Sequence, residues 1–275
     1  MTILETILAH KKHEVAERKA LYPQPLLEKS IYMTTPVVSL KRYLRRIDKV
    51  GVIAEIKRRS PSKGDLNPHI SVERLSIGYM QAGASALSVL TDQKFFGGSN
   101  EDLQVARRFN FCPILRKDFI VDPYQIVESR SLGADAILLI AAALEPSVLR
   151  ELAAFAHRLG LEVVLEIHSA EELDACWSPS IDVVGVNNRD LRDFSVSLER
   201  SLSLAERIPS ESVKISESGL HRAEDLWQLK QVGFDGFLIG EMFMKRSQPE
   251  EGCAQLIREY QAIAKQHASA AAAPA

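Results

Sequence analysis

Six side chains capable of acid, base or hydrogen-bond chemistry lie at or near the ends of short strand-like runs. They are Glu55, Lys57, Lys117, Glu166, Asn187 and Glu217. Within 51–57, the charged residues occur only in the last three positions, after an apolar run. Parallel strands bring their carboxyl ends to one edge of a sheet, so these groups would share one surface. Carboxylates and amines grouped in this way can move protons to and from a bound molecule.

The composition is that of a large globular domain. Its 275 residues are 46% apolar, enough to bury a substantial core, and the formal net charge is -2. Basic residues are scattered, so we expect neither nucleic acid nor a membrane as a partner. Cys112, Cys176 and Cys253 form no C-x-x-C pair, which indicates neither disulfides nor a zinc site. No run approaches the roughly 20 apolar residues needed to span a bilayer, and we expect a cytoplasmic protein.

Eight apolar, β-branched runs alternate with helical patterns. They occupy 51–57, 85–90, 112–117, 135–141, 162–167, 182–187, 213–217 and 235–240. Several are apolar almost throughout, which is typical of parallel strands covered on both faces. Helix signals fall between them: Asp122 precedes Pro123 as an N-cap would, and Gly133 ends that segment. The pattern predicts an α/β protein with a single (β/α)8 TIM barrel, and the missing G-x-G-x-x-G after the first run argues against a dinucleotide fold.

The residues before and after these units form separate segments. The N-terminal segment has an apolar face that includes Ile3, Leu4 and Ile7, and it predicts helix packed on the barrel or lying over its active site. Lys11 and its charged neighbours are expected on the solvent face. The C-terminal segment has few apolar side chains to hold it in place. We therefore expect an N-terminal helical extension, a catalytic barrel and a flexible Ala-rich tail, at 1–48, 49–265 and 266–275.

Strand periodicity places the reactive side chains on one inward-facing surface. Alternate residues of a strand share a face, so Lys57 lies on the same side as Glu55 and Ile53, and Lys117 on the same side as Leu115. Each group alone also has a structural explanation, because a lone lysine is more often a surface charge. Several strands that all place ionisable groups at one end are harder to explain structurally, since desolvated charges are costly. We therefore interpret the rim as a catalytic site.

Two late glycines indicate a phosphorylated substrate. Gly219 follows the seventh run and Gly240 ends the eighth. Barrel enzymes often bind phosphate at these two places, through backbone N–H groups and a helix N-terminus. The seven histidines form no H-E-x-x-H or H-x-x-E-H motif. We expect no metal and no cofactor.

Longer motifs around these residues resemble the indole-3-glycerol phosphate synthase family. The matching segments are 55–62, 94–99, 115–119, 165–168, 187–191 and 216–219. The resemblance covers nearly the whole chain, including the N-terminal extension. It implies a carbon-carbon lyase of tryptophan biosynthesis that converts 1-(2-carboxyphenylamino)-1-deoxyribulose 5-phosphate into indole-3-glycerol phosphate, carbon dioxide and water.

The resemblance also implies a role for each rim residue. Lys117 would be the general acid for the ribulose carbonyl, and Glu166 the base during dehydration. Lys57 would hold the substrate carboxylate or phosphate side and is a candidate acid in the second stage. The residues expected to orient these groups are Glu55, Asn187 and Glu217.

The substrate itself would be bound by two further sets of residues. The phosphate would be bound at Ser218, Gly219, Gly240 and Glu241, chiefly through backbone groups. The aromatic and carboxylate parts would be bound at Ser60, Pro61, Phe96, Phe119, Leu138, Arg189 and Leu191, and Leu238 is a further expected substrate-binding residue. The partner expected is a small phosphorylated anthranilate-ribulose molecule, and the protein is expected to be a monomer or a weak homo-oligomer.

Two alternatives remain at the level of sequence. A related phosphosugar barrel such as phosphoribosylanthranilate isomerase would keep the phosphate turns but use a different acid and base pair. A non-catalytic sensor of a phosphorylated ligand would bind without turnover. The combination of Lys57, Lys117 and Glu166 disfavours both.

Overall fold

Eight parallel strands close into a barrel in the order β1-β10-β9-β8-β7-β6-β5-β4. This arrangement is seen in a computed structural model that describes residues 2–190 and 194–271. The strands are β1 (Val52–Ile56), β4 (Ala86–Leu90), β5 (Ile114–Lys117), β6 (Ala136–Ile140), β7 (Glu162–Ile167), β8 (Val183–Asn187), β9 (Val213–Glu217) and β10 (Gly236–Ile239). The predicted (β/α)8 TIM barrel is confirmed, and all eight expected strands are present.

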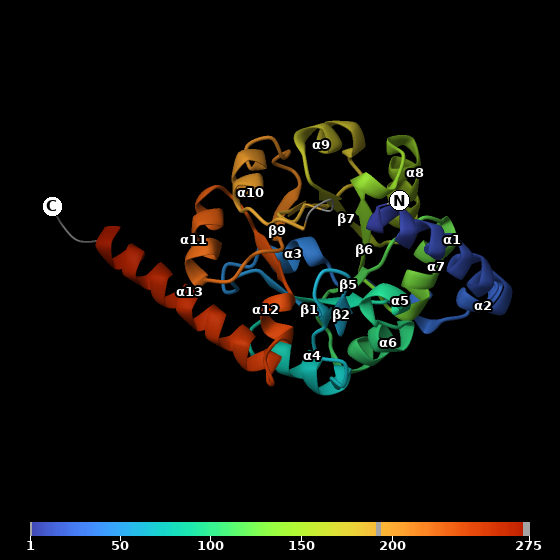
Figure 1. Cartoon of the computed structure of the whole chain (residues 1–275), viewed down its shortest axis with the longest axis horizontal. Helices are drawn as coiled ribbons and strands as arrows, with labels where there is room; N and C mark the ends of the chain where they lie inside the picture. Colours follow the sequence, from blue (N-terminus) through green and yellow to red (C-terminus); the bar gives the residue numbers. More distant parts are fainter. Residues whose placement is uncertain (1, 191–193, 272–275) are drawn as a thin grey trace.

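Helices surround the strands, and those that lie between two strands in the chain supply the crossovers (Figure 1). They are α4 (Val72–Gln81), α6 (Asn100–Phe109), α7 (Pro123–Leu132), α8 (Pro146–Arg158), α9 (Ala170–Cys176), α10 (Glu199–Leu204), α11 (Ala223–Gln231) and α13 (Pro249–Ala271), with the short helices α5 (Gln93–Phe96), η2 (Ala141–Ala143) and α12 (Glu241–Met244). The signals read for α7 are confirmed: Asp122 accepts a hydrogen bond from the Tyr124 N–H at 2.9 Å, and Gly133 ends the helix with a φ of 90°. Only a left-handed residue closes a helix in this way, and glycine adopts that conformation freely.

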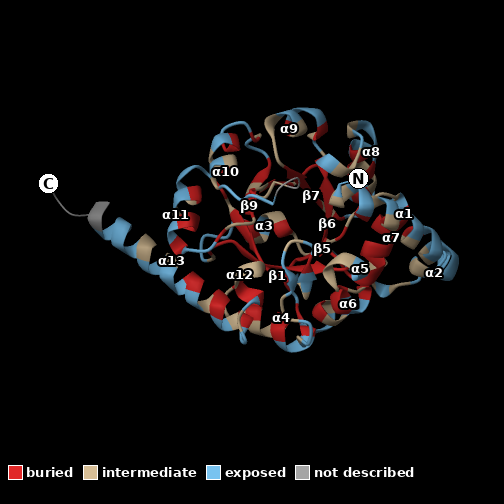
Figure 2. Cartoon of the chain, in the orientation of Figure 1, coloured by how far each residue is buried: buried red, intermediate tan, exposed pale blue. Residues whose placement is uncertain are grey.

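The N-terminal extension covers one side of the barrel and its lower end. It contains α1 (Ile3–Leu21), α2 (Gln24–Leu27), η1 (Ile31–Met33) and α3 (Leu40–Leu44). Helices α1, α2 and η1 contact α7, which is buried along nearly its whole length (Figure 2). The Arg18 guanidinium lies 2.6 Å from the Glu128 carboxylate, and the Tyr124 hydroxyl donates to the Tyr22 carbonyl at 2.8 Å. These bonds attach the extension to the barrel.

Alternate residues of the strands fill the barrel interior, as strand periodicity predicts. Ile53, Leu115, Val164 and Ile215 belong to one buried interior cluster. Their neighbours in sequence, such as Ala54, face the surrounding helices in a second cluster. The reactive residues Glu55, Lys117 and Glu217 have the same parity as the interior residues, because each lies two positions further along its strand. Polar groups therefore form the upper layer of an apolar interior.

Two leucines of α3 complete the interior from below. Leu40 and Leu44 are 0% and 1% exposed and pack in the same cluster as Ile53 and Ile215. The sequence analysis assigned helix to this extension but did not identify these leucines as part of the barrel core.

Three local features differ from the sequence-based expectation. The polar loop after β1 contains a small antiparallel pair, β2 (Arg59–Ser60) and β3 (Gly64–Asp65). Lys11, expected on the solvent face, is completely buried. Helix α13 continues to Ala271, past the end expected for the barrel at residue 265. The flexibility of 266–275 and the domain boundaries stay predictions.

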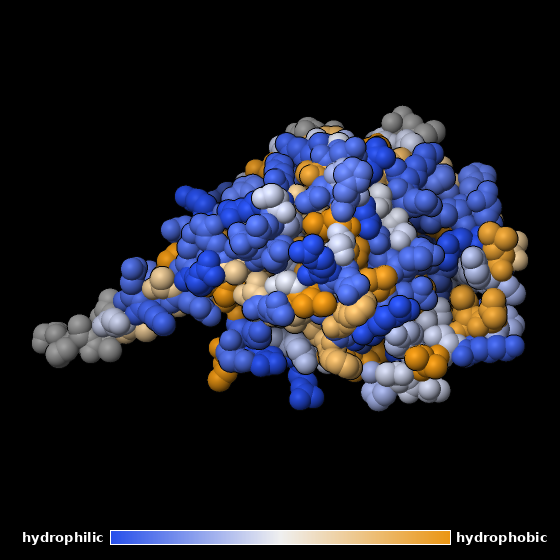
Figure 3. Space-filling model, turned by 90° about the horizontal axis from the view of Figure 1, so that it is seen from below, coloured by the Kyte–Doolittle hydropathy of each residue, from blue (hydrophilic) through white to orange (hydrophobic). Residues whose placement is uncertain are grey.

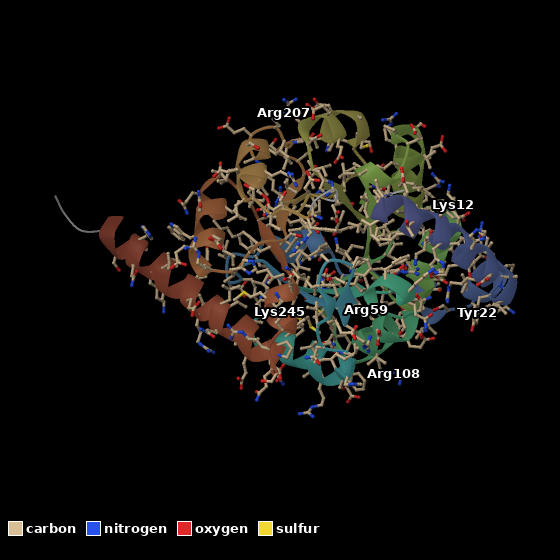
Figure 4. The ribbon with its side chains drawn as sticks, viewed as in Figure 1. Lys12, Tyr22, Arg59, Arg108, Arg207 and Lys245 are labelled. Atoms are coloured by element: carbon tan, nitrogen blue, oxygen red, sulfur yellow. The ribbon has the colours of Figure 1, made fainter. Side chains whose placement is uncertain are left out.

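The outer surface is mostly polar on the face seen from below, where apolar side chains form small separate groups (Figure 3). Basic residues are distributed around the periphery, and Lys12, Arg108 and Arg207 lie at different edges of the molecule (Figure 4). Within the described ranges, no helix is both long enough and apolar enough to cross a membrane.

We predict that Leu44→Ala lowers the free energy of unfolding by about 2–5 kcal/mol, because it removes a buried side chain and leaves a cavity in the closed barrel. Urea unfolding measures the change. Leu21→Ala is the control, since Leu21 belongs to the same extension but is 71% exposed, and it should change stability by less than about 0.5 kcal/mol. Equal losses in the two variants would show that α3 is not part of the barrel core.

Candidate active site

The Lys117 ammonium group occupies the centre of the upper barrel, between two carboxylates. Its Nζ lies 2.7 Å from Glu166 Oε2 and 2.9 Å from Glu217 Oε2. The three residues come from β5, β7 and β9, which are alternate strands and therefore contribute to the same layer of the interior. Glu166 and Glu217 are 4% and 2% exposed, so the charges are compensated by one another and not by bulk water. The structure thus brings together three residues that are distant in sequence.

Gly185 in β8 and Gly240, directly after β10, leave room for the carboxylates. A Cβ atom at Gly185 would lie 2.3 Å from Glu217 Oε1, and one at Gly240 would lie 2.4 Å from Glu55 Oε1. Real Cβ atoms do not approach other atoms so closely, so larger residues would displace both glutamates. Gly240, which we assigned to the phosphate turn, therefore has a second role as the space that the Glu55 side chain occupies.

Asn187 fixes the orientation of Glu166. Its Nδ2 donates to Glu166 Oε1 at 3.0 Å, while its own Oδ1 accepts from the Arg189 backbone N–H at 3.0 Å. Because both oxygens of Glu166 are hydrogen-bonded, the carboxylate is held in one plane. The Arg189 guanidinium in turn lies 3.0 Å from Glu241 Oε2. Two of the expected binding residues thus contact each other directly.

A second pair of a lysine and a glutamate, Lys57 and Glu55, lines the same cavity as Lys117. Lys57 Nζ contacts Glu55 Oε1 at 2.5 Å, and both side chains line the cavity that contains Lys117. The pair could be structural on the evidence of sequence alone. Its position on the cavity wall places the Lys57 charge within the candidate site.

Apolar side chains from three segments form the opposite wall. The rings of Phe96 and Phe119 pack against each other with centroids 5.9 Å apart. Ile3, Leu4 and Ile7 of α1 line the same cavity. An aromatic ring fits such a wall because contact with these side chains removes apolar surface from water. The N-terminal helix therefore contributes part of the candidate site.

The turn after β9 has an unusual backbone. Ser218 and Gly219 have φ values of 69° and 73°, both in the left-handed region. A Cβ atom at Gly219 would lie 2.2 Å from Val196 Cγ1, so glycine is required there for conformation and for space. This turn and the start of α12 after β10 both line the cavity.

The burial of these groups shifts their pKa values in opposite directions. Burial disfavours the Lys117 charge, but attraction to Glu166 and Glu217 outweighs it, so the pKa of Lys117 is raised. For Glu166, burial is likewise outweighed by Lys117, and its pKa is lowered. For Glu217, burial dominates over the attraction of Lys117 and raises the pKa to about 7. The two carboxylates therefore differ in acidity because Lys117 compensates one more fully than the other.

Every expected site residue in the described ranges lines this one cavity. The catalytic set is Glu55, Lys57, Lys117, Glu166, Asn187 and Glu217, and the binding set is Ser60, Pro61, Phe96, Phe119, Leu138, Arg189, Ser218, Gly219, Leu238, Gly240 and Glu241. Leu191 lies outside the described residues. Among the described residues, no three histidine, cysteine or carboxylate groups are arranged as metal ligands would be.

Some cavity residues were not identified from the sequence. They include Ile3, Leu4, Ile7, Ser62, Leu90, Asp118, Ile140, Phe194, Leu220, His221, Ile239 and Met242. Helical spacing marked the apolar face of α1, but spacing within one helix does not show which surface it covers.

The geometry defines the class of protein. Amines and carboxylates from several strands converge at the carboxyl-terminal rim of a barrel, next to an apolar wall and glycine-containing turns, as in a barrel enzyme that performs acid-base chemistry. A family model for indole-3-glycerol phosphate synthase matches residues 4–256. The chain belongs to the indole-3-glycerol phosphate synthase family, and it is therefore a carboxy-lyase of tryptophan biosynthesis that uses a phosphorylated substrate.

Relatives of known name agree with this assignment. Indole-3-glycerol phosphate synthase of Bacteroides thetaiotaomicron is 48% identical over 259 residues, which are 94% of this chain and 99% of that protein. The enzyme of the same name from Burkholderia ambifaria is 41% identical over 258 residues, which are 92% of this chain and 98% of that one. The family predicted from the sequence is confirmed, and neither alternative is favoured.

Solved structures show the same fold at low sequence identity. Thiamine phosphate pyrophosphorylase from Pyrococcus furiosus aligns with a TM-score of 0.60 at 13% identity, covering 82% of this chain and 99% of that one. The tryptophan synthase α-subunit of Legionella pneumophila aligns with a TM-score of 0.59 at 15% identity, covering 82% and 98%. These similarities concern the barrel alone.

We predict that Glu217→Gln changes the pH dependence of stability. A carboxyl whose pKa is raised binds a proton more readily in the folded state, so it lowers stability as pH rises from 4.5 to about 7. The stability of the glutamine variant relative to the natural chain should therefore increase with pH across that window, by on the order of 1 kcal/mol per pKa unit. Urea unfolding at several pH values measures it, with the exposed Glu211→Gln as control. A pH-independent difference would contradict the raised pKa of Glu217.

Proposed function

We propose that Lys117 and Glu166 perform the acid and base steps of the family reaction at this site. The observation that carries the proposal is the position of Lys117 Nζ, 2.7 Å from Glu166 and 2.9 Å from Glu217 in the centre of the rim. The two carboxylates keep Lys117 protonated, so the proton that the carbonyl oxygen receives is present before substrate binds. The same contacts fix its position before substrate binds.

In the first stage, Lys117 protonates the ribulose carbonyl oxygen. The aromatic carbon that bears the carboxylate attacks the carbonyl carbon, and the carbonyl electron pair moves to the oxygen that receives the proton. A carbon-carbon bond is formed, and loss of carbon dioxide then returns the bonding electrons to the ring. Stabilising the charge that develops on the oxygen is the contribution expected of a preorganised cation.

In the second stage, Glu166 removes a proton while the new hydroxyl group leaves as water. Asn187 holds the Glu166 carboxylate through its 3.0 Å hydrogen bond, so the basic oxygen keeps a fixed direction. Lys57 is the candidate acid for the departing hydroxyl, because it lines the same cavity and is close to Glu55. Glu55 and Glu217 orient the two lysines.

The remaining contacts accommodate the two ends of the substrate. The phosphate binds at the turns of Ser218 with Gly219 and Gly240 with Glu241, where the backbone lies at the cavity wall. Phe96 and Phe119 contact the aromatic ring, and Lys57 and Arg189 supply positive charge for the carboxylate. The aromatic and phosphate binding regions thus leave the reacting carbons near Lys117.

We further propose that the protein is located in the cytoplasm, acts on a small molecule and does not bind nucleic acid. We propose that it is a monomer or a weak homo-oligomer. The free, buried cysteines Cys112, Cys176 and Cys253 support a reducing compartment, since disulfides are typical of oxidising ones. Size-exclusion chromatography with light scattering tests the oligomeric state.

We predict that Lys117→Met lowers kcat by roughly 10²–10⁴-fold, the range typical of a lost general acid. The substrate Kd should change far less, because the lysine acts on charge that develops only in the transition state. Turnover is followed by indole fluorescence after addition of the carboxyphenylamino-deoxyribulose phosphate. The control is Lys12→Met, an exposed lysine at the molecular edge, which should keep full activity (Figure 4). Near-normal turnover by Lys117→Met would exclude its role as the acid.

We predict that Glu166→Gln impairs dehydration more than ring closure. The amide keeps the shape of the side chain but cannot take up the proton, so a ring-closed, decarboxylated and still hydroxylated intermediate should accumulate. Rapid-quench measurements detect it directly. Glu171→Gln changes an exposed carboxylate nearby and should show natural kinetics. Unchanged formation of the final indole would remove Glu166 from the mechanism.

A further inference from the structure

A fully buried lysine on the N-terminal helix connects the candidate site to α1. Lys11 is 0% exposed, and its Nζ lies 2.9 Å from Asp92 Oδ2, 2.9 Å from Asp118 Oδ1 and 3.1 Å from Glu14 Oε2. Asp92 and Asp118 are 0% and 2% exposed. Burying Lys11 with Asp92 and Asp118 is a costly arrangement, because these three charges lose their hydration, whereas Glu14 stays partly exposed. Lys11 itself does not line the cavity.

Each buried aspartate holds one of the three segments that form the apolar wall of the cavity, which we call the aromatic pocket. Asp92 accepts hydrogen bonds from the Phe95 and Phe96 N–H groups at 2.8 and 3.2 Å, at the start of α5. Asp118 directly follows Lys117 and accepts from the Phe119 N–H at 2.8 Å. Lys11 therefore joins the two backbone segments that carry the paired rings of Phe96 and Phe119.

Lys11 also holds α1, the third segment of the aromatic pocket. Ile7 lies four residues before Lys11, one helical turn away on the same face of α1, and it lines the cavity. The His10 ring also contacts Phe95 edge-on, with centroids 5.8 Å apart. The first half of α1 is thus attached to the site by Lys11, whereas the second half is attached to α7 through Arg18 and Glu128.

The charges continue beyond the aspartates into the strand that carries Lys117. Asp118 Oδ2 accepts from the Thr91 hydroxyl at 2.5 Å and from Arg116 Nη2 at 3.2 Å, and Arg116 also lies 2.7 Å from Glu128. Arg116 is 2% exposed and points to the outer side of β5, opposite to Lys117. Ion pairs of alternating charge therefore connect Lys11 with Arg18 under α1. The series runs through Asp118, Arg116 and Glu128. Burial opposes the Lys11 charge, but Asp118 and Asp92 outweigh it and raise the pKa of Lys11, so it stays protonated near neutral pH.

We propose that Lys11 is a positioning residue, which acts through Asp92 and Asp118 to place the aromatic pocket formed by Phe96, Phe119 and α1. It touches neither the substrate nor the reacting atoms. This inference rests on the proposed function, in which that pocket holds the aromatic ring of the substrate. The ring supplies the attacking carbon, but the wall makes only apolar contacts with it, and such contacts are the same in the ground state and in the transition state. Losing them raises KM and leaves kcat unchanged.

The test compares Lys11→Met with Lys12→Met, the exposed lysine next in sequence. Both are assayed with the carboxyphenylamino-deoxyribulose phosphate at a temperature where urea unfolding shows the proteins fully folded. Lys11→Met should raise KM by at least about tenfold and change kcat by less than about threefold, as expected for lost uniform binding. The constant for competitive inhibition by inorganic phosphate should be unchanged, since the phosphate turns lie on β9 and β10. Lys12→Met should match the natural chain.

A second variant keeps the inference testable if Lys11→Met does not fold. Ile7→Ala shortens the α1 wall without exposing a charge and should also raise KM at unchanged kcat. Where Lys11→Met does fold, its effect on KM and that of Ile7→Ala should be less than additive in the double variant, because both act on the position of one helix. An unchanged KM in Ile7→Ala, or additive effects, would overturn the proposal.

Other outcomes separate this inference from the proposed function. If phosphate inhibition weakens as much as KM rises, Lys11 supports the barrel in general and the positioning role is wrong. If Lys11→Met is kinetically normal while Lys117→Met is inactive, the catalytic assignment stands and the Lys11 proposal fails. If the natural chain itself shows no turnover, the proposed function fails first.

Discussion

Alternation of side chains along parallel strands is the constraint on which the rest of this structure depends. Closing eight strands into a barrel turns every second residue inward, and the interior is too narrow for anything except side chains. Ile53, Val164 and Ile215 fill its middle. The same parity then brings Glu55, Glu166 and Glu217 to the rim on different strands. The fold therefore assembles the site as a consequence of packing the core.

Charges at such a rim are stable only where they are paired. Lys117 is held by Glu166 and Glu217, and Lys57 by Glu55, so each cation has a carboxylate within hydrogen-bond distance. The pairs also need space, which Gly185 and Gly240 provide by lacking a side chain. Removing a partner from a buried pair leaves an uncompensated charge and is strongly destabilising. Stability and the proposed chemistry thus depend on the same atoms.

The N-terminal extension contributes to the barrel at both ends. At the lower end, Leu40 and Leu44 of α3 close the interior. At the upper end, α1 places Ile7 on the cavity wall and buries Lys11 against two aspartates. Between them, α1 and α2 cover α7, whose residues would otherwise face water. The extension is therefore continuous with both the core and the candidate site.

The sequence by itself determined the eight strands, the barrel and the rim residues. Each of these follows from local patterns: apolar runs of strand length, alternate residues on one face, and helix signals such as Asp122 and Gly133. Family motifs added the reaction. The local pattern gave the wrong prediction for Lys11. A lysine beside other charged residues in an amphipathic helix is usually exposed, but Lys11 is buried.

Only the tertiary structure decided which groups meet. The contacts of Lys11 with Asp92 and Asp118, of Gly240 with Glu55 and of Leu44 with the interior join segments that are far apart in the chain. No periodicity within one segment specifies such a contact, because it depends on where the other segment lies. The physical reason is that the surroundings of a charged side chain decide its role. A charge in water needs no protein partner, whereas a buried charge is stable only when oppositely charged groups surround it, and those contacts then hold the segments together.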